Sequence, residues 1–150
     1  MEVTVENAIA IREINREDAR AIKAIRSAIS PGSADVDFQK LVDQHAGEGN
    51  GRTSLVAEVN GEVVGYMIST TLYAGFGIRK SAWIMSLGVH PDFMGQGVGI
   101  ELANRICEIY KERGVKSIYS SVLWDSIDVL SFFKKLGFKR SEFINLKKDL

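Results

Sequence analysis

The sequence predicts an α/β (α+β) fold in which a mixed, largely antiparallel central sheet is flanked by helices. Along the chain, two kinds of segment follow one another. In one kind apolar and polar residues alternate, as in half-buried strands, and in the other apolar residues recur at helical spacing. Asn60-Gly61 separates two runs rich in β-formers, which suits a two-residue type I′ hairpin. After this hairpin the predicted order is strand, helix, strand, helix, strand, an order that gives a mixed sheet with helices packed on it.

The N-terminal third is expected to hold one strand and two helices. Alternation predicts the strand over residues 8–13. Asn15 is the expected N-cap of a helix that ends at Pro31-Gly32. Its inward face carries Ala19, Ile22, Ile25 and Ile29. A shorter helix is expected over 37–46, with His45 on its apolar side.

In the remaining two thirds of the chain, the sequence predicts five strands and two helices. The strands are expected over 54–59, 62–71, 82–89, 115–123 and 143–147, and the helices over 98–113 and 126–136. Residues 82–89 are nearly all apolar, which predicts a strand buried on both faces. The segment after Phe138 has room for about one strand.

Composition narrows the function classes. The 150 residues predict a single domain, 1–150. The 19 basic and 19 acidic residues cancel, which disfavours nucleic acid and anionic membranes as partners. One cysteine and two histidines make a metal centre a poor expectation. No apolar run is long enough to span a membrane, and the acidic start lacks a signal-peptide layout, so we expect a cytoplasmic protein.

The informative segment is VHPDFMGQGVG, residues 89–99, where a buried strand ends and a glycine-rich loop opens a helix. Glycines at alternate positions free the backbone, so consecutive N–H groups can point at one anion beside the positive end of the helix dipole. We interpret the loop as a phosphate cradle. A P-loop would need a lysine after Gly97, and a dinucleotide fingerprint would need a glycine at Ile100, so neither fits.

This loop resembles motif A of the GNAT acetyltransferase superfamily, and FFKKLGF, residues 132–138, is similar to a later helix of that family. The resemblance implies that the pyrophosphate of acetyl-CoA sits on the backbone of Gly95, Gln96, Gly97, Val98 and Gly99. It also implies that the pantetheine arm pairs with the strand edge at Leu87 and Val89, and that the Leu87 N–H binds the thioester oxygen. Gly88 then marks either a bulge or close approach, or a simple strand irregularity.

The sequence departs from the family pattern at three cofactor-binding positions. Met94 stands where a Gln or Arg side chain donates to phosphate, and Phe133 stands where a Tyr often protonates the leaving thiolate. Ser126 replaces an Asn and can still hydrogen-bond or cap. The backbone cradle is unaffected by these replacements.

A general base is harder to assign. Met85 stands where family members often have Glu, and residues 82–89 hold no acid. Candidates elsewhere are Asp35, Asp37, His45 and Asp125, with Ser86 as a residue that could hold a water. For the acids a solvated surface role is favoured, and for His45 packing is favoured. Cys107 lacks a basic or acidic partner, which favours packing over nucleophilic catalysis.

Together these features predict an acetyl-CoA-dependent N-acetyltransferase that moves an acetyl group to a primary amine by direct attack in a ternary complex. Residues 1–50 hold 6 basic and 9 acidic residues, which suggests a cationic small-molecule or peptide acceptor. Tyr73, Phe76 and Trp83 are candidate walls of its pocket, and a second chain, as a homodimer, could complete that side. The alternative is a non-catalytic acyl-CoA-binding or sensor module on the same fold; a binder of another nucleotide is a weaker third reading.

Overall fold

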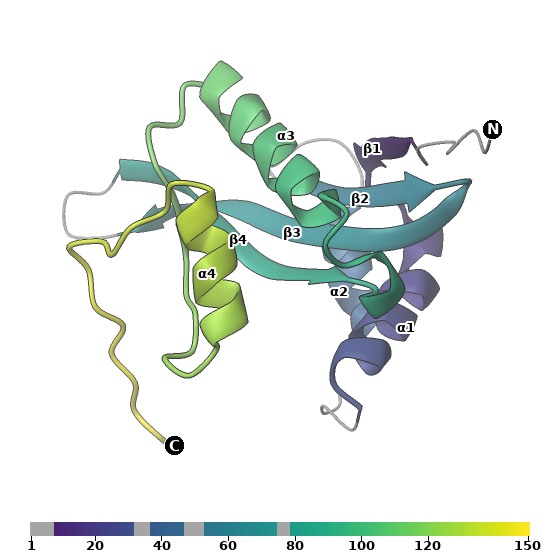
Figure 1. The fold of residues 1–150 in the computed structure, drawn as a ribbon. Coiled ribbons are helices and arrows are strands. Elements are labelled where there is room, and N and C mark those ends of the chain that lie inside the picture. The colour runs from purple at the N-terminus through teal and green to yellow at the C-terminus, as the bar shows by residue number, and fades with distance from the viewer. Residues whose placement is uncertain (1–7, 32–36, 47–52, 75–78) are drawn as a thin grey trace.

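The computed structural model describes residues 8–31, 37–46, 53–74 and 79–150, and a five-stranded sheet forms its centre (Figure 1). The strand order is β1-β2-β3-β4-β5; the first four strands run antiparallel and β5 runs parallel to β4. The strands are β1 (Ile9–Glu13), β2 (Ser54–Val59), β3 (Glu62–Ala74), β4 (Arg79–Val89) and β5 (Ile118–Ser120). The predicted mixed, largely antiparallel sheet is confirmed.

Helices cover both faces of this sheet (Figure 1). They are α1 (Ala19–Ile29), α2 (Phe38–His45), α3 (Val98–Glu112) and α4 (Ile127–Lys135), with short 3-10 turns η1 (Arg16–Asp18) and η2 (Pro91–Phe93). One apolar core lies between the sheet and α1 and α2, and another lies between the sheet and α3 and α4. Along β2 successive side chains alternate between these cores, because Leu55 and Ala57 belong to one and Val56 to the other.

The hairpin between β2 and β3 has the predicted turn. Asn60 has φ +52° and Gly61 has φ +78°. Both central residues of a type I′ turn require positive φ, which Asn and Gly tolerate best. The dipeptide therefore fixes the antiparallel pairing of β2 with β3.

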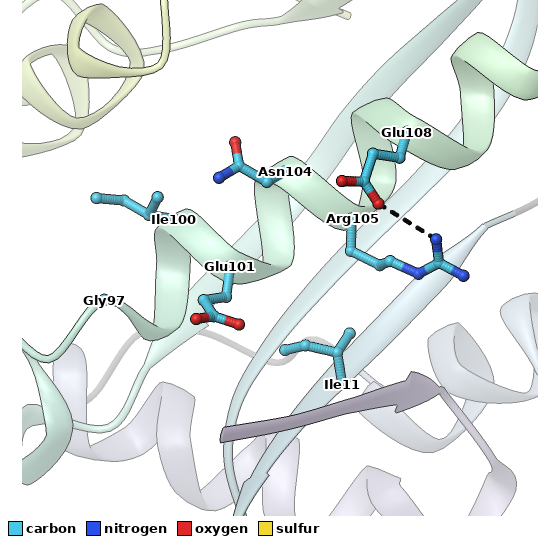
Figure 2. A pocket seen from close by; sticks show the side chains of 7 residues that line it. All are labelled: Ile11, Gly97, Ile100, Glu101, Asn104, Arg105 and Glu108. Atoms are coloured by element: carbon cyan, nitrogen blue, oxygen red, sulfur yellow. Dashed lines mark hydrogen bonds and ion pairs between the residues drawn. The ribbon is translucent and has the colours of Figure 1, made fainter. Parts of the chain in front are cut away.

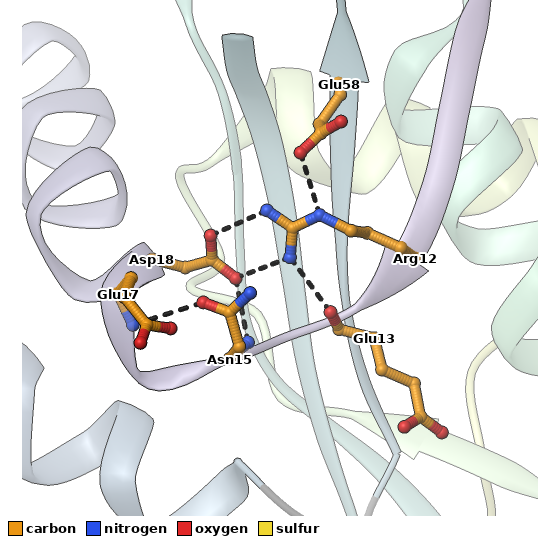
Figure 3. Close-up of polar contacts among 6 residues, drawn as sticks. All are labelled: Arg12, Glu13, Asn15, Glu17, Asp18 and Glu58. Atoms are coloured by element: carbon orange, nitrogen blue, oxygen red, sulfur yellow. Dashed lines mark hydrogen bonds and ion pairs between the residues drawn. The ribbon is translucent and has the colours of Figure 1, made fainter. Parts of the chain in front are cut away.

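A polar cluster fastens the start of α1 to the sheet (Figure 3). The Asn15 side chain accepts the Glu17 N–H at 3.1 Å and the Asp18 carboxylate accepts the Asn15 N–H at 2.8 Å, which confirms Asn15 as a cap. Arg12 donates to both Asp18 oxygens at 2.8 Å. Its Nε donates to Glu58 on β2 at 2.8 Å. The hydrogen bond to Asp18, aided by Glu58, raises the pKa of Arg12, so this guanidinium stays charged.

Three predictions about the strands need correction. The strand expected over 115–123 is limited to Ile118–Ser120. No strand forms over 143–147 within the described residues, and this segment pairs with no strand of the sheet. β4 is not buried on both faces: Met85 is 57% exposed, because the strand loses its neighbour beyond Ile84.

Candidate active site

β4 and β5 separate part-way along their length. They pair only at Ala82–Ile118, Trp83–Tyr119 and Ile84–Ser120. The Ser120 hydroxyl donates to the Ile84 carbonyl at 3.1 Å. The last pair of the β4–β5 ladder thus includes a hydrogen bond from a side chain. The second half of β4 then has β3 on one side and no described strand on the other.

A β-bulge lies at the point of separation. In the β3–β4 ladder Ile68 pairs with Ser86, but the next residue, Ser69, pairs with Ile84. Met85 is the extra residue, and a bulge of this kind bends its strand and increases the twist. The bulge therefore accounts for why β4 leaves the line of β5.

The free edge of β4 presents particular backbone groups. The His90 N–H donates to the Val64 carbonyl at 2.8 Å, so it points toward β3. Backbone N–H directions alternate along a strand, so those of Val89 and Leu87 point away from β3, toward the free edge. Their side chains lie partly buried against the α3 core. Leu87 and Val89 are the two residues that the sequence analysis expects to pair with the pantetheine arm.

The glycine loop follows directly from this edge. Gly95 and Gly97 have φ +78° and +83°, and a Cβ at either position would meet nothing within 4 Å. The left-handed backbone, not lack of space, therefore requires glycine at both. In the described chain, no well-formed backbone hydrogen bond uses an N–H between that of Met94, which donates to Pro91, and that of Glu101, which donates to Gly97. Unused N–H groups thus gather at the start of α3.

Close packing holds the start of α3 in place. A Cβ at Gly65 on β3 would lie 2.8 Å from Val98 Cγ1, and a Cβ at Gly99 would lie 3.0 Å from Phe132 Cε2. Real Cβ contacts are longer, so both glycines permit an approach that alanine would block. The start of α3 therefore packs closely against both β3 and α4.

Comparison with protein families agrees with this geometry. Residues 9–138 match the model of the Acetyltransferase (GNAT) family. The chain belongs to this family. Membership confirms the expected fold and an N-acetyltransferase as the class of enzyme.

Solved structures of GNAT proteins superpose over nearly the whole chain. The aminoglycoside N-acetyltransferase AAC(6')-Iy in complex with CoA has a TM-score of 0.82 at 16% identity, covering 99% of each chain. The aminoglycoside acetyltransferase meta-AAC0020, from an uncultured soil metagenomic sample, in complex with sisomicin scores 0.76 at 18% identity, covering 97% of this chain and 99% of that one. A ribosomal-protein-alanine N-acetyltransferase from Brucella melitensis biovar Abortus 2308 scores 0.73 at 15% identity, covering 95% and 100%. At these identities the likeness shows the fold.

Ser86 and Gly88 face away from α3, toward the core that α1 and α2 cover. The Ser86 hydroxyl lies 3.2 Å from the buried Tyr66 hydroxyl. A Cβ at Gly88 would lie 2.8 Å from Tyr66 Cε1 and 3.1 Å from Ile29 Cδ1. The glycine thus makes room for the tyrosine ring, and the bulge of this GNAT strand lies at Met85 instead.

The other predicted cofactor residues are spread over the loop and α4. Met94 is 54% exposed beside the loop glycines, and Gln96 is exposed with its side chain donating to the Asp92 carbonyl at 3.3 Å. Ser126 is the N-cap of α4 without a side-chain cap hydrogen bond. Phe133 is 5% exposed and packs edge-to-face against Phe132 and Phe138, so the core holds it.

The candidate bases lie in different parts of the molecule. Asp37 accepts the Lys40 N–H at 3.0 Å and caps α2, and Asp35 lies outside the described residues. His45 is 7% exposed, with Nδ1 3.4 Å from the Ser54 hydroxyl, which confirms packing. Asp125 is exposed in the turn before α4. Of these groups Asp125 alone belongs to the segment that joins β5 to α4, beside the separated strands.

The structure describes two of the three aromatic residues expected to wall the acceptor pocket, Tyr73 and Trp83. Phe76 lies outside the described residues. Trp83 stacks on Tyr119 with ring centroids 5.2 Å apart, and Tyr73 is 72% exposed. Sequence reasoning missed Tyr66 and Ser120, which set the two sides of β4. Both are ordinary strand residues in the sequence, so no local signal could have found them.

A surface pocket of about 410 Å³ lies between α3 and β1 and shares Gly97 with the glycine loop (Figure 2). It is lined by Ile11, Gly97, Ile100, Glu101, Asn104, Arg105 and Glu108. Arg105 and Glu108, one turn apart on α3, pair with each other at 3.3 Å on the helix side of this pocket. Because β1 is three places from β4 in the sheet, this pocket does not lie on the free edge. In the described residues no helix is long and apolar enough to cross a membrane, and no cluster of three metal-ligating side chains occurs.

Proposed function

We propose that this protein binds acetyl-CoA and transfers its acetyl group to a primary amine by direct attack in a ternary complex. The observation that carries the proposal is the continuity between two sets of unused backbone N–H groups. The edge of β4 at Leu87 and Val89 is joined by the short turn η2 to the glycine loop and the N-terminus of α3. An extended amide-containing arm that ends in a pyrophosphate matches this pair of features.

Cofactor binding divides between the loop and the strand edge. Gly95, Gln96, Gly97, Val98 and Gly99 supply backbone N–H groups to the pyrophosphate, aided by the helix dipole. Leu87 and Val89 pair with the pantetheine amides, as one strand pairs with another. Met94 and Ser126 complete the set as contacts around the bound molecule, whereas Phe133, 5% exposed, supports α4 from the core side. The sulfur end then lies near the bulge at Met85.

The transfer step needs an oxyanion donor and a base. The amine lone pair attacks the thioester carbon, and the Leu87 N–H stabilises the oxyanion that forms. The intermediate loses one N–H proton to water and collapses to an amide and CoA thiolate, which leaves readily because a thiol has a pKa of about 8.5. An alkylamine has a pKa of about 10.4, so a proton must be removed before attack. We assign this role to Asp125 through water, with Ser86 as a positioning residue for the water.

A cationic amine is the acceptor class we favour. A polyamine, an amino sugar, or a lysine or N-terminal amine of a peptide would fit the acidic N-terminal third. Asp43 on α2 is an exposed acid of that third. Two of the superposed structures are aminoglycoside acetyltransferases, and one of them is in complex with sisomicin. We also propose that the protein forms a homodimer, in which a second chain completes the acceptor side of the site.

A second candidate is a non-catalytic acyl-CoA-binding module. The observation that favours it is the pair Met85 and Phe133, at positions where GNAT sequences often have Glu and Tyr. Met85 projects from the bulge with no acid on its strand, and Phe133 is held in the core. Such a protein would bind acetyl-CoA and leave it intact.

Calorimetry and an acetylation assay separate these possibilities. We expect one-site, saturable binding of acetyl-CoA and none of ATP, and then turnover on at least one amine of a panel of polyamines, aminoglycosides and peptides. Asp125→Asn should lower kcat about tenfold to a hundredfold and leave acetyl-CoA affinity unchanged. Asp128→Asn, an equally conservative change at a nearby exposed acid, is the control and should change neither. Binding without turnover would favour the sensor module, and absence of binding would overturn both.

A further inference from the structure

The hydroxyl group of Tyr66 lies in the core between the sheet and the helices α1 and α2. Tyr66 is 0% exposed, and the other members of this core are apolar, such as Ile22 of α1 and Ile68 of β3. Within the described residues, this hydroxyl has one hydrogen-bond partner, the Ser86 hydroxyl at 3.2 Å. A phenol is more acidic than an aliphatic alcohol, so we assign Tyr66 as the donor and Ser86 as the acceptor. Ser86 thus supplies the partner that a buried hydroxyl requires.

The Tyr66 ring is held over Gly88 of the neighbouring strand. These two residues are directly opposite in the β3–β4 ladder, and Ser86 is the diagonal neighbour of Tyr66 on the same face. An aromatic side chain is long enough to reach a diagonal neighbour. A Cβ at Gly88 would lie 2.8 Å from the ring and 3.1 Å from Ile29 of α1, so the ring fills the space that the glycine leaves. Packing on these sides directs the Tyr66 hydroxyl toward Ser86.

Ser86 lies where the thioester end of the proposed ligand arm would be. Its carbonyl carbon is bonded to the nitrogen of Leu87, the N–H proposed to bind the thioester oxygen. The Leu87 side chain packs against the α3 core, so that face of β4 is filled at this point. Ser86 is only partly buried on the opposite face, and the preceding bulge residue Met85 is 57% exposed. An amine that attacks the thioester carbon therefore arrives on the face that carries Ser86.

We propose that Tyr66 is a positioning residue for acetyl transfer and acts through Ser86; this inference rests on the proposed function. A serine side chain has three staggered rotamers, and the hydrogen bond from Tyr66 favours the one seen here. This bond occupies one lone pair of the Ser86 oxygen, so the other lone pair and the hydroxyl proton keep fixed directions. They bind the water that takes the proton of the incoming amine. Tyr66 itself stays in the core and touches no substrate.

Tyr66→Phe removes the hydroxyl and keeps the ring. We expect kcat for acetyl transfer to fall by about threefold to tenfold, which is what one hydrogen bond contributes, with the KM and Kd for acetyl-CoA unchanged. Tyr110→Phe is the matched control, because Tyr110 is 2% exposed and its hydroxyl lies 2.8 Å from that of Ser69, on the α3 side of the sheet. Both variants lose a buried hydroxyl with a serine partner, so Tm should fall by similar amounts. Only Tyr66→Phe should lower kcat, and equal kcat losses in the two variants would overturn the proposal.

A double-mutant cycle tests whether Tyr66 acts through Ser86. Ser86→Ala should lower kcat, and adding Tyr66→Phe should lower it no further, because the hydroxyl that Tyr66 positions is already gone. A Tyr66 that only stabilises the fold would instead reduce kcat equally in both backgrounds, and that result would refute the assignment. A parent protein that acetylates no amine would overturn the proposed function and this assignment with it. An active parent whose kcat is unchanged by Tyr66→Phe would overturn this assignment alone.

Discussion

Replacing Gly97 by alanine tests the glycine loop most directly. Gly97 has φ +83° and ψ +6°, and a Cβ there would meet nothing within 4 Å. The cost of alanine is therefore conformational only, about 1–2 kcal/mol for a non-glycine residue in left-handed backbone. The substituted loop can relieve this cost by rotating its backbone, which turns the N–H groups of the cradle away from a common point.

Binding of acetyl-CoA must then return the loop to its left-handed conformation, and the conformational cost of that change is subtracted from the binding free energy. We expect Gly97→Ala to raise the acetyl-CoA Kd by about fivefold to thirtyfold, which is the same 1–2 kcal/mol expressed as affinity. Isothermal titration measures this change, and thermal unfolding measures what remains as lost stability. The lost binding free energy and the lost free energy of unfolding should together stay near about 1–2 kcal/mol, the conformational cost of alanine at this position.

Gly61→Ala is the matched control. Gly61 has φ +78° and open space around its Cβ position, but it lies in the hairpin between β2 and β3. We expect the same loss of stability, about 1–2 kcal/mol, with unchanged acetyl-CoA affinity. If both variants bind acetyl-CoA as tightly as the parent protein, or if both weaken it equally, the loop is not a cradle and the reasoning from its backbone fails.

Three further changes test the packing and charge of the structure. Gly88→Ala should lower stability by about 1–3 kcal/mol, measured by urea unfolding, because its Cβ would lie 2.8 Å from the Tyr66 ring; an unchanged midpoint would contradict this packing. Arg12→Ala should cost about 2 kcal/mol by leaving the buried Asp18 carboxylate unpaired, and Arg12→Lys should recover only part of it, because lysine cannot make both bonds of the fork. Burial raises the pKa of the Cys107 thiol, so its alkylation should be slower than that of free cysteine at pH 8 and still accelerate above pH 9; a plateau below pH 8.5 would refute this.

Local chemistry explains which elements could be predicted from the sequence. The Asn15 cap and the Asn60-Gly61 turn were predictable because each depends on backbone preferences of one or two residues. The start of α3 at Val98 was predictable for the same reason, since glycines precede it and helical periodicity follows. Boundaries of β4 and β5 were less accurate, because they depend on which strand lies alongside.

The candidate site divides in the same way. Its loop is continuous in sequence, so the glycines that shape it are visible together. The free edge is not, because it depends on a register shift at Met85 and on where pairing with Ser120 stops. Nothing in an apolar run marks which residue is extra relative to a neighbouring strand. Met85 was singled out only as a missing acid, whereas its structural role is to turn the strand edge toward the loop.

The C-terminal segment shows why a correct strand pattern can fail to give a strand. The sequence of residues 143–147 predicts a strand, and Phe143 and Asn145 contact the β5 region at Tyr119 and Ser121. A strand, however, is defined by hydrogen bonds to a neighbour, and β5 offers only three residues, Ile118–Ser120. One chain therefore supplies the pattern without enough of a partner to complete it.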